Sequence, residues 1–281
     1  MKTRSWMGGL LLLATAIAVV IGLLLREPAY HGRSLRAWLR DLEHPSALVR
    51  HNAQEAVGYL GTNAVPAIQK MLHAEDLPIK TNIILLVSRQ RFVRIRFVPA
   101  RERRISAAQA CFVLGPRAEP AIPDLFEFSL GDSYCRNLAE SAMGQMGAGA
   151  VGRLSRELTN EDFHVRRTAA GALHHIGAPG IKAADALVNC LKDRYGSVRT
   201  EAAHALGRMD PSPAILNGLA ETLDDAEPEV RIAAAVSLIG FGERAIPVLS
   251  ERLKTTDLKG SARITNVLYE IAAARKNGSQ E

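Results

Sequence analysis

The chain has 281 residues, with 35 Lys and Arg against 29 Asp and Glu, and a formal net charge of +6. Its apolar share of 47% excludes a disordered chain, and its aromatic share of 5% disfavours a β-sandwich, whose strands are rich in aromatic residues. Three cysteines exclude a fold held together by a disulfide framework.

The N-terminus carries an apolar segment. Residues 1–6 are a short tail with two basic residues, and residues 7–25 are 19 residues without a charge. As a helix this run is about 28 Å long, enough to cross a bilayer core of about 30 Å. It is longer than the apolar region of a cleaved signal peptide, so we expect an uncleaved transmembrane signal anchor.

The orientation of this anchor rests on two opposed observations. Basic residues are more numerous after the segment than before it, which favours a cytoplasmic position for the rest of the chain. A very short tail ahead of a first apolar segment is typical of an export signal, and large domains can be exported despite flanking charge. We therefore expect a single-pass membrane protein whose body is extracytoplasmic.

Residues 26–45 are predicted to be a linker and an N-terminal cap helix. Ser34 is suited to an N-cap, and the apolar residues that follow it fall on one helix face. These residues are Leu35, Trp38, Leu39 and Leu42.

From residue 46 onward the chain repeats one pattern. Six segments align without gaps: VRHNAQEAVGYLG (49–61), RRISAAQACFVLG (103–115), CRNLAESAMGQMG (135–147), VRRTAAGALHHIG (165–177), VRTEAAHALGRMD (198–210) and VRIAAAVSLIGFG (230–242). Apolar or small residues at positions 1, 5, 8, 9 and 12 predict an amphipathic helix, and the glycine that closes most segments suits a C-cap. A second helix is expected about three residues later, with proline in the first turn of several of them.

Two charged series accompany the repeat. The second position is always arginine: Arg50, Arg104, Arg136, Arg166, Arg199 and Arg231. An aspartate closes each of five units: Asp132, Asp162, Asp193, Asp225 and Asp257. Aspartate before a helix predicts an N-cap, and its position also favours a contact with the arginine of the following repeat. The same residue type at one helix position in every unit indicates a packing role rather than a ligand-binding stripe.

The pattern Asp…Val-Arg-x-x-Ala-Ala-x-Ala-Leu-Gly at 30–33 residues resembles HEAT repeats, in particular the short PBS-lyase HEAT-like form. The resemblance covers roughly residues 46–257 and implies an all-α fold, an α-α superhelix or α-solenoid of about seven units. It implies first helices on the convex face, second helices on the concave face, and a buried aspartate–arginine ladder. We expect the solenoid to span residues 46–276, with 258–276 as a degenerate capping unit and 277–281 as a polar tail.

An insertion at about residues 77–103 interrupts the period. Residues 91–99 (RFVRIRFVP) alternate arginine with apolar residues, which favours an extended segment over a helix. Residues 89–104 carry seven arginines and one glutamate, so this stretch has a net charge of +6. Its arginines either pair with acidic residues of neighbouring repeats, which we favour, or bind an acidic partner, lipid head groups or a phosphate backbone. The candidate partner-binding residues are Arg89, Arg91, Arg94, Arg96, Arg101 and Arg103.

The sequence shows no catalytic, cofactor-binding or metal-binding motif. The His-Glu dipeptides with which HEAT-like deoxyhypusine hydroxylases bind iron are absent, as are paired cysteines and phosphate-binding glycine loops. Cys111, Cys135 and Cys190 are expected to be buried as small apolar side chains. We therefore expect a non-catalytic protein–protein interaction scaffold or assembly factor with no cofactor. The alternatives are an enzyme of the bilin-lyase type, which the resemblance permits, and nucleic-acid binding through the arginine-rich insertion. HEAT-like DNA glycosylases use a basic concave groove, and the mixed charge of the second helices disfavours that activity.

Overall fold

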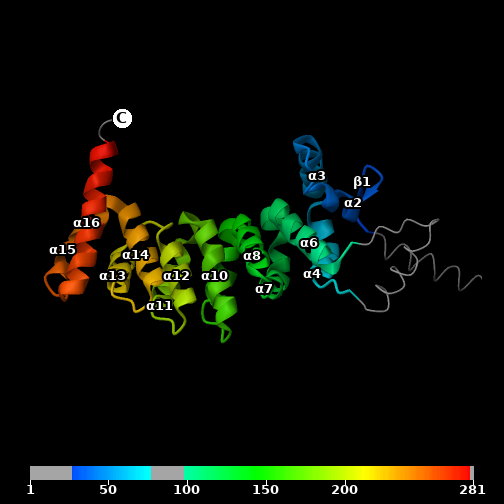
Figure 1. Cartoon of the computed structure of the whole chain (residues 1–281). Coiled ribbons are helices and arrows are strands. Elements are labelled where there is room, and N and C mark those ends of the chain that lie inside the picture. Colours follow the sequence, from blue (N-terminus) through cyan, green and yellow to red (C-terminus); the bar gives the residue numbers. More distant parts are fainter. Residues whose placement is uncertain (1–26, 77–97, 279–281) are drawn as a thin grey trace, which may run out of the picture.

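The computed structural model describes residues 27–76 and 98–278, and most of these residues lie in helices stacked as an elongated array (Figure 1). Six helix pairs follow one another: α3 (Ala47–Leu60) with α4 (Val65–Leu72), α6 (Ala100–Leu114) with α7 (Ile122–Ser129), α8 (Ser133–Gln145) with α9 (Val151–Glu157), α10 (Phe163–Ile176) with α11 (Ala184–Cys190), α12 (Gly196–Leu206) with α13 (Pro213–Thr222), and α14 (Pro228–Phe241) with α15 (Ile246–Leu253). The predicted α-solenoid is confirmed. The described residues hold six pairs, one fewer than the expected number of units.

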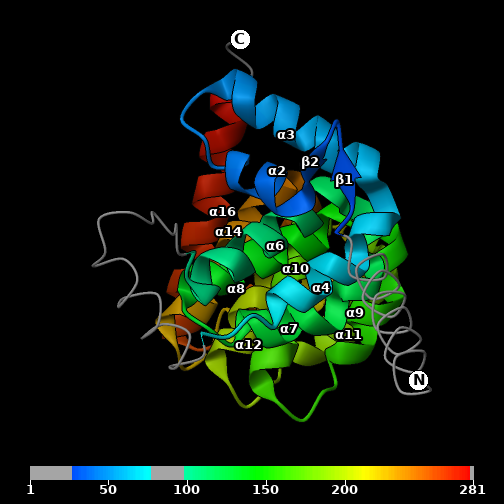
Figure 2. The same cartoon turned by 90° about the vertical axis from the view of Figure 1, so that its right-hand side faces the viewer.

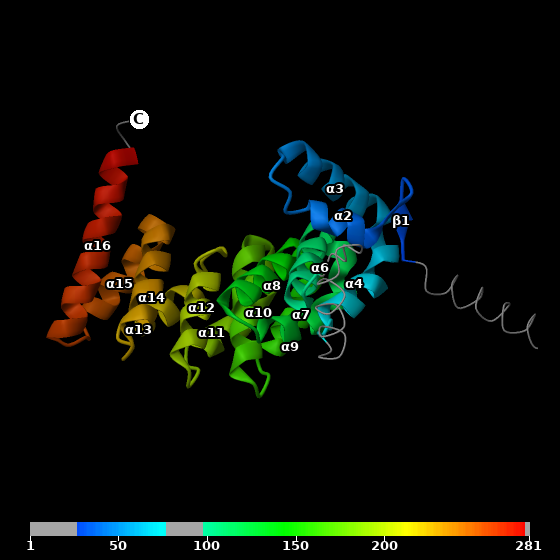
Figure 3. The same cartoon turned by 45° about the vertical axis from the view of Figure 1, so that its right-hand side comes forward.

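The first helices form one layer of the array and the second helices form the other, with successive pairs side by side (Figure 3). The main hydrophobic core runs between the layers. In α10, for example, Ala169, Ala172 and Leu173 are completely buried on the predicted stripe. Alanine on this stripe lets neighbouring first helices approach closely, because its methyl group adds little width to the helix.

Five of the pairs are joined by a turn of 3-10 helix. The glycine at the start of the turn has a positive φ of 55° to 69°, a conformation that residues with a Cβ rarely adopt. These glycines are Gly61, Gly115, Gly147, Gly177 and Gly242. The second helices begin after these turns. The sequence pattern predicts proline in the first turn of a second helix, but Pro120 and Pro179 lie in the 3-10 turns.

The N-terminal end of the described array is a small hairpin followed by a short helix. Strands β1 (Ala29–Tyr30) and β2 (Arg33–Ser34) pair antiparallel, and α2 (Leu35–Asp41) follows directly. The Trp38 indole donates to the Tyr30 carbonyl at 3.1 Å and ties the hairpin to the helix. Part of the predicted linker is thus ordered. Ser34 occupies the N-cap of α2 as predicted, but its side chain makes no capping hydrogen bond. Figure 2 shows this end of the molecule toward the viewer, with α3 beyond the hairpin.

The C-terminal end is closed by α16 (Leu258–Gly278), a single helix of 21 residues. Ile264, Val267 and Ile271 are buried on one face, and α16 packs against α14 and α15. The degenerate capping unit predicted for residues 258–276 consists of this one continuous helix. The helix continues to residue 278, beyond the predicted start of the polar tail.

The boundary of the insertion also differs from the prediction. Helix α6 begins at Ala100, so residues 100–103 belong to a repeat helix and not to the insertion. The proposed membrane segment at 7–25 and the alternating segment at 91–97 lie outside the described residues.

Candidate interaction surface

The arginine and aspartate series meet at two positions of the array. Arg166 Nε and Nη2 donate to the two carboxylate oxygens of Asp193 at 2.7 and 2.9 Å, and Arg199 binds Asp225 in the same way at 2.7 and 2.8 Å. The side chains of these pairs are only 10–12% exposed. Paired planar groups of this kind form the stronger class of ion pairs. Although burial acts to raise it, the pKa of Asp193 is held below its ordinary value by hydrogen bonds from Arg166 and from the Tyr195 N–H.

The direction of these pairs corrects the prediction. Each carboxylate binds the arginine of its own unit, 27 or 26 residues earlier, and not the arginine of the following repeat. The following arginine reaches the main chain instead: Arg199 Nη1 donates to the Asp193 carbonyl, and Arg231 Nη1 donates to the Asp225 carbonyl, both at 2.8 Å. Each aspartate at these two positions therefore links two successive first helices, one through its side chain and one through its backbone.

The other aspartates act as helix caps. Asp132, Asp162 and Asp257 each precede a helix directly and accept a hydrogen bond from a main-chain N–H two or three residues later. Asp193 and Asp225 lie further from their helices, since Tyr195 and Glu227 occupy the N-cap positions. The ladder implied by the family resemblance is thus formed at two positions, and the remaining aspartates satisfy the N-terminal N–H groups of helices.

The remaining arginines of the series do not pair with these aspartates. Arg50 binds the carbonyls of His44 and Pro45. The Nε atoms of Arg104 and Arg136 are buried without a hydrogen-bond partner in the described part of the chain.

Two of the six candidate partner-binding arginines lie in α6 and are engaged within the chain. Arg101 pairs with Asp132 at 2.6 Å, and Arg103 pairs with Asp76 at 2.9 Å. Asp76 also accepts two hydrogen bonds from the Ala100 N–H, at 3.0 and 2.8 Å. This single carboxylate therefore connects the two ends of the insertion. Arg89, Arg91, Arg94 and Arg96 lie outside the described residues.

A groove runs over the second-helix layer at the C-terminal half of the array. We define this second-helix groove as three adjoining hollows over α11, α13, α15 and the start of α16. The first hollow, of about 380 Å³, has Val188, Leu191 and Gly218 among its lining residues. Asn217 and Glu221 line this hollow and also the next one, toward α15. The third hollow shares Asp224 with the first.

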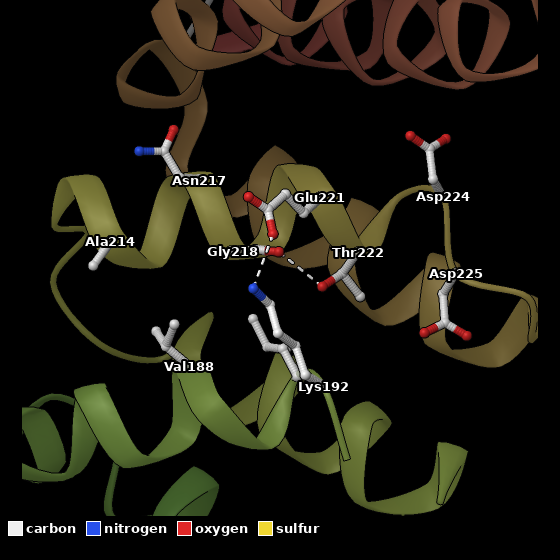
Figure 4. Close-up of a pocket in the computed structure, with 10 residues that line it drawn as sticks. Val188, Lys192, Ala214, Asn217, Gly218, Glu221, Thr222, Asp224 and Asp225 are labelled. Carbon is white, nitrogen blue, oxygen red and sulfur yellow. Dashed lines mark hydrogen bonds and ion pairs between the residues drawn. The ribbon is translucent and has the colours of Figure 1, made fainter. Parts of the chain in front are cut away.

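The groove carries both signs of charge, and several of these charges are paired. In the first hollow, Lys192 and Glu221 point toward each other from neighbouring units, 3.5 Å apart (Figure 4). The Asp224 carboxylate forms ion pairs with Arg252 at 2.7 Å and with Arg263 at 2.5 Å. Five carboxylates line the three hollows against three basic side chains: Glu221, Asp224, Asp225, Glu251 and Asp257 against Lys192, Arg252 and Arg263. The surface is polar and slightly acidic.

The three cysteines are free and buried, as predicted. Burial raises the pKa of the Cys111 thiol to about 12 and that of Cys190 to about 11. Both groups are therefore neutral thiols at physiological pH and not nucleophilic thiolates.

The histidines of the described residues make local contacts. His73 on the α4 side lies 2.6 Å from Asp124 of α7, whose hydrogen bond raises the pKa of the imidazole. Ser141 Oγ lies 3.4 Å from His175 Nε2, which is long for an activated hydroxyl. Within residues 27–76 and 98–278, no three His, Cys, Asp or Glu side chains are grouped so that they could hold a metal ion.

One stretch of the described chain is long and apolar enough to span a membrane by those two criteria alone. It is Pro228–Leu253, 26 residues that include an 18-residue window with a mean hydropathy of 1.6. This stretch comprises α14, a 3-10 turn and α15, and the turn at Gly242 divides it into one helix pair of the array. Helices that pack inside a protein can meet the same criteria, so the stretch is weak evidence for a membrane span.

Comparisons with known proteins agree with this architecture. The family model for HEAT repeats matches residues 122–207 and 184–265, which together make up just over half of the chain. A HEAT repeat-containing taxis protein of Halobacterium salinarum is 34% identical over an alignment of 132 residues, and the match covers 40% of this chain. The match spans 32% of that relative's length.

Solved structures with some similarity include two enzymes. The complex of CpcE and CpcF of phycocyanin lyase from Nostoc sp. PCC7120 is 27% identical, with a TM-score of 0.42 over 53% of this chain and 98% of that chain. Human deoxyhypusine hydroxylase is 19% identical, with a TM-score of 0.35 over 85% of this chain and 84% of that chain. The assignment itself rests on the repeat pattern, the stacked helix pairs and the extent of the family-model match. On these grounds, the chain belongs to the HEAT-repeat family.

Proposed function

We propose that this protein is a non-catalytic scaffold that binds an extended segment of a protein partner in the second-helix groove. The observation that carries the proposal is that three neighbouring hollows across α11, α13 and α15 share lining residues. A groove that crosses several parallel helices matches a linear segment better than a compact small molecule. Repeat arrays use such extended surfaces for binding, since exposed residues can vary without disturbing the stacked core.

The chemistry of the groove favours a polypeptide as the bound partner. Val188, Leu191 and Ala214 offer apolar contacts, and the Asn217 amide supplies both a donor and an acceptor. Most of the charged side chains already have a partner of opposite sign within the array. Because carboxylates outnumber basic groups along the groove, a nucleic-acid backbone would be repelled there.

Membrane attachment through residues 7–25 is the second part of the proposal. It is supported by 19 residues without a charge, a length that suits a bilayer core. Fractionation should recover the full chain in the membrane pellet after carbonate washing. Protease added to intact cells or spheroplasts should then digest the array, as expected for an extracytoplasmic body. Recovery of the intact chain in the soluble fraction would contradict the anchor, and protection from protease would contradict the orientation.

Site-specific photo-crosslinking tests the binding surface. A photoreactive residue at position 217 of the full-length protein in its native membrane should yield one discrete adduct with a partner protein. The same residue at Asn137, an exposed asparagine on the first-helix layer, is the matched control and should not yield that adduct. An adduct that forms only from position 137, or equally from both positions, would overturn the assignment of the groove.

A further inference from the structure

The contact between α8 and α10 brings two titratable side chains onto glycines. A Cβ added to Gly171 of α10 would lie 2.5 Å from Glu140 Cδ, and a Cβ added to Gly144 of α8 would lie 2.4 Å from His175 Cβ. Each helix therefore presents bare backbone to a side chain of the other. We call these four residues, Glu140, Gly144, Gly171 and His175, the α8–α10 seam. The Glu140 side chain therefore packs directly against the backbone of the facing helix.

Glu140 occupies a position at which four of the five other repeats carry alanine. It is only 6% exposed, and its Oε1 is buried without a hydrogen-bond partner in the described part of the chain. Among the described residues, the basic atom nearest to Glu140 Oε1 is Arg136 Nε, and the 3.8 Å between these atoms is too long for a hydrogen bond. An ionised carboxylate needs such bonds when it is buried, so the geometry fits the neutral acid.

Three charged groups face Glu140 from the surrounding helices. They are Arg136 on α8, Arg167 on α10 and Glu201 on α12. Burial, and then the negative charge of Glu201, raise the pKa of Glu140 to about 8 against the opposing effect of the two arginines. At the other end of the seam, burial and the neighbouring His174 lower the pKa of His175. Both titratable groups of the seam are thus uncharged near pH 7.

We propose that the α8–α10 seam is a proton-controlled hinge, closed while Glu140 is protonated and opened locally when Glu140 loses its proton to solvent. On ionisation the carboxylate gains from moving toward water, and this movement separates it from the backbone of Gly171. The seam lies between the N-terminal helix pairs and the pairs that carry the second-helix groove. Opening it would change the relative orientation of these two parts of the array, whether or not the groove binds a partner.

The sign of the pH dependence follows from proton linkage. In an opened seam Glu140 regains an ordinary pKa near 4.5, whereas in the closed seam it titrates at about 8. The closed form therefore binds more protons between these values, and the open form gains population as the pH rises. His175 acts in the opposite direction, but only below its ordinary pKa of 6.5. Between pH 6.5 and 8 the opening equilibrium should increase roughly tenfold.

Hydrogen exchange of the full-length protein tests the proposal. After correction for intrinsic exchange rates, amides facing the seam in α8 and α10 should show a roughly tenfold increase in opening from pH 6.5 to 8. Amides of α14, which lies away from the seam, are the internal reference and should show no such change. Glu140→Gln keeps the shape of the neutral acid and should abolish the pH dependence. An unchanged pH dependence in Glu140→Gln, or the same increase in α14, would overturn the proposal.

A second measurement needs no substitution. The side-chain carboxyl ¹³C resonance of Glu140, followed by NMR in the wild-type protein, should titrate near pH 8. Titration near pH 4.5 would show that the carboxyl group is solvated in the native seam and would refute the hinge.

Discussion

The Arg166–Asp193 pair offers the sharpest test of how the array is held together. Asp193→Ala removes the acceptor of two charge-assisted hydrogen bonds from Arg166, a residue that is only 8% exposed. The Arg166 guanidinium then keeps only the carbonyls of Asn160 and Glu161 as partners. It also removes the acceptor of the Tyr195 N–H at the start of α12. Breaking a buried ion pair in this way costs about 3–5 kcal/mol, because one charge stays buried and uncompensated.

The matched control is Glu221→Ala, which removes the exposed partner of Lys192. In that pair the side chains are 76% and 53% exposed and 3.5 Å apart, so the loss should be about 0.5 kcal/mol. Urea unfolding followed by circular dichroism at 222 nm measures both values. For a domain of this size the larger loss corresponds to a decrease in Tm of roughly 10 °C. Equal losses in the two variants, or a loss below about 1 kcal/mol in Asp193→Ala, would refute the structural role of the pair.

The same pair predicts a pH dependence. The pKa of Asp193 is lowered in the folded protein, so the folded state binds fewer protons than the unfolded state around the ordinary pKa of aspartate. The stability that it contributes is complete above that ordinary value, near pH 4, and is lost as the pH falls through the lowered pKa. Asp193→Ala should therefore show a weaker loss of stability on acidification than the wild type. Identical acid denaturation curves for the two proteins, measured relative to their stability at pH 7, would contradict this assignment.

Three further predictions concern helix packing, the burial of a thiol and the hydrogen bonds of Asp76. Gly207→Ala should destabilise the array by about 1–3 kcal/mol in urea unfolding, because the new Cβ would lie 2.7 Å from Ser237 Cβ. The control Gly240→Ala, whose new Cβ would have nothing within 4 Å, should be neutral or stabilising. Equal destabilisation by the two substitutions would contradict the close contact at Gly207. Cys111 should react with a thiol reagent only after denaturation, because its thiol is fully buried with a raised pKa, and rapid labelling of the native protein would be inconsistent with this burial. Asp76→Ala should increase hydrogen exchange at the start of α6, because Ala100 and Arg103 lose their shared acceptor, and unaltered exchange there would show that this carboxylate does not hold the insertion.

The helix pairs could be predicted from the sequence because their pattern repeats. The buried stripe and the closing glycine recur in nearly every unit, so six imperfect copies support one another. Gly177 illustrates the principle: it follows the last helical residue and adopts a φ of 69°, as a helix-ending glycine should. The family assignment followed from the same recurrence.

The direction of the aspartate–arginine pairs could not be predicted, because two arginines lie within reach of each aspartate. Asp193 has Arg166 before it and Arg199 after it, and both bind it, one at the carboxylate and the other at the carbonyl. The choice depends on how the loop turns before the next helix, since an aspartate directly at the N-cap, such as Asp162, bonds the helix instead. The repeat spacing in the sequence predicts where the helices lie but does not predict the conformation of the loop before each helix.

The second-helix groove could not be predicted from the sequence, because its residues do not follow the repeat. Residues that line the second-helix groove, such as Asn217, differ from one unit to the next and leave no repeated signal. Glu140 did leave a detectable signal, since it breaks a nearly constant alanine position, but only the close approach of Gly171 shows what that exception means. The start of α6 was misplaced because its arginines continue the charge run of the insertion without a break.

The most direct test of the scaffold function is the affinity of the crosslinked partner for groove variants of the full-length protein. Asn217→Arg places a long charged side chain between two of the hollows and should weaken binding at least about tenfold, since it blocks the path of the bound segment. Asn137→Arg makes the same change on the first-helix layer and should bind like the wild type. Unaltered affinity in Asn217→Arg, or an equal loss in both variants, would contradict the assignment of the second-helix groove as the binding surface.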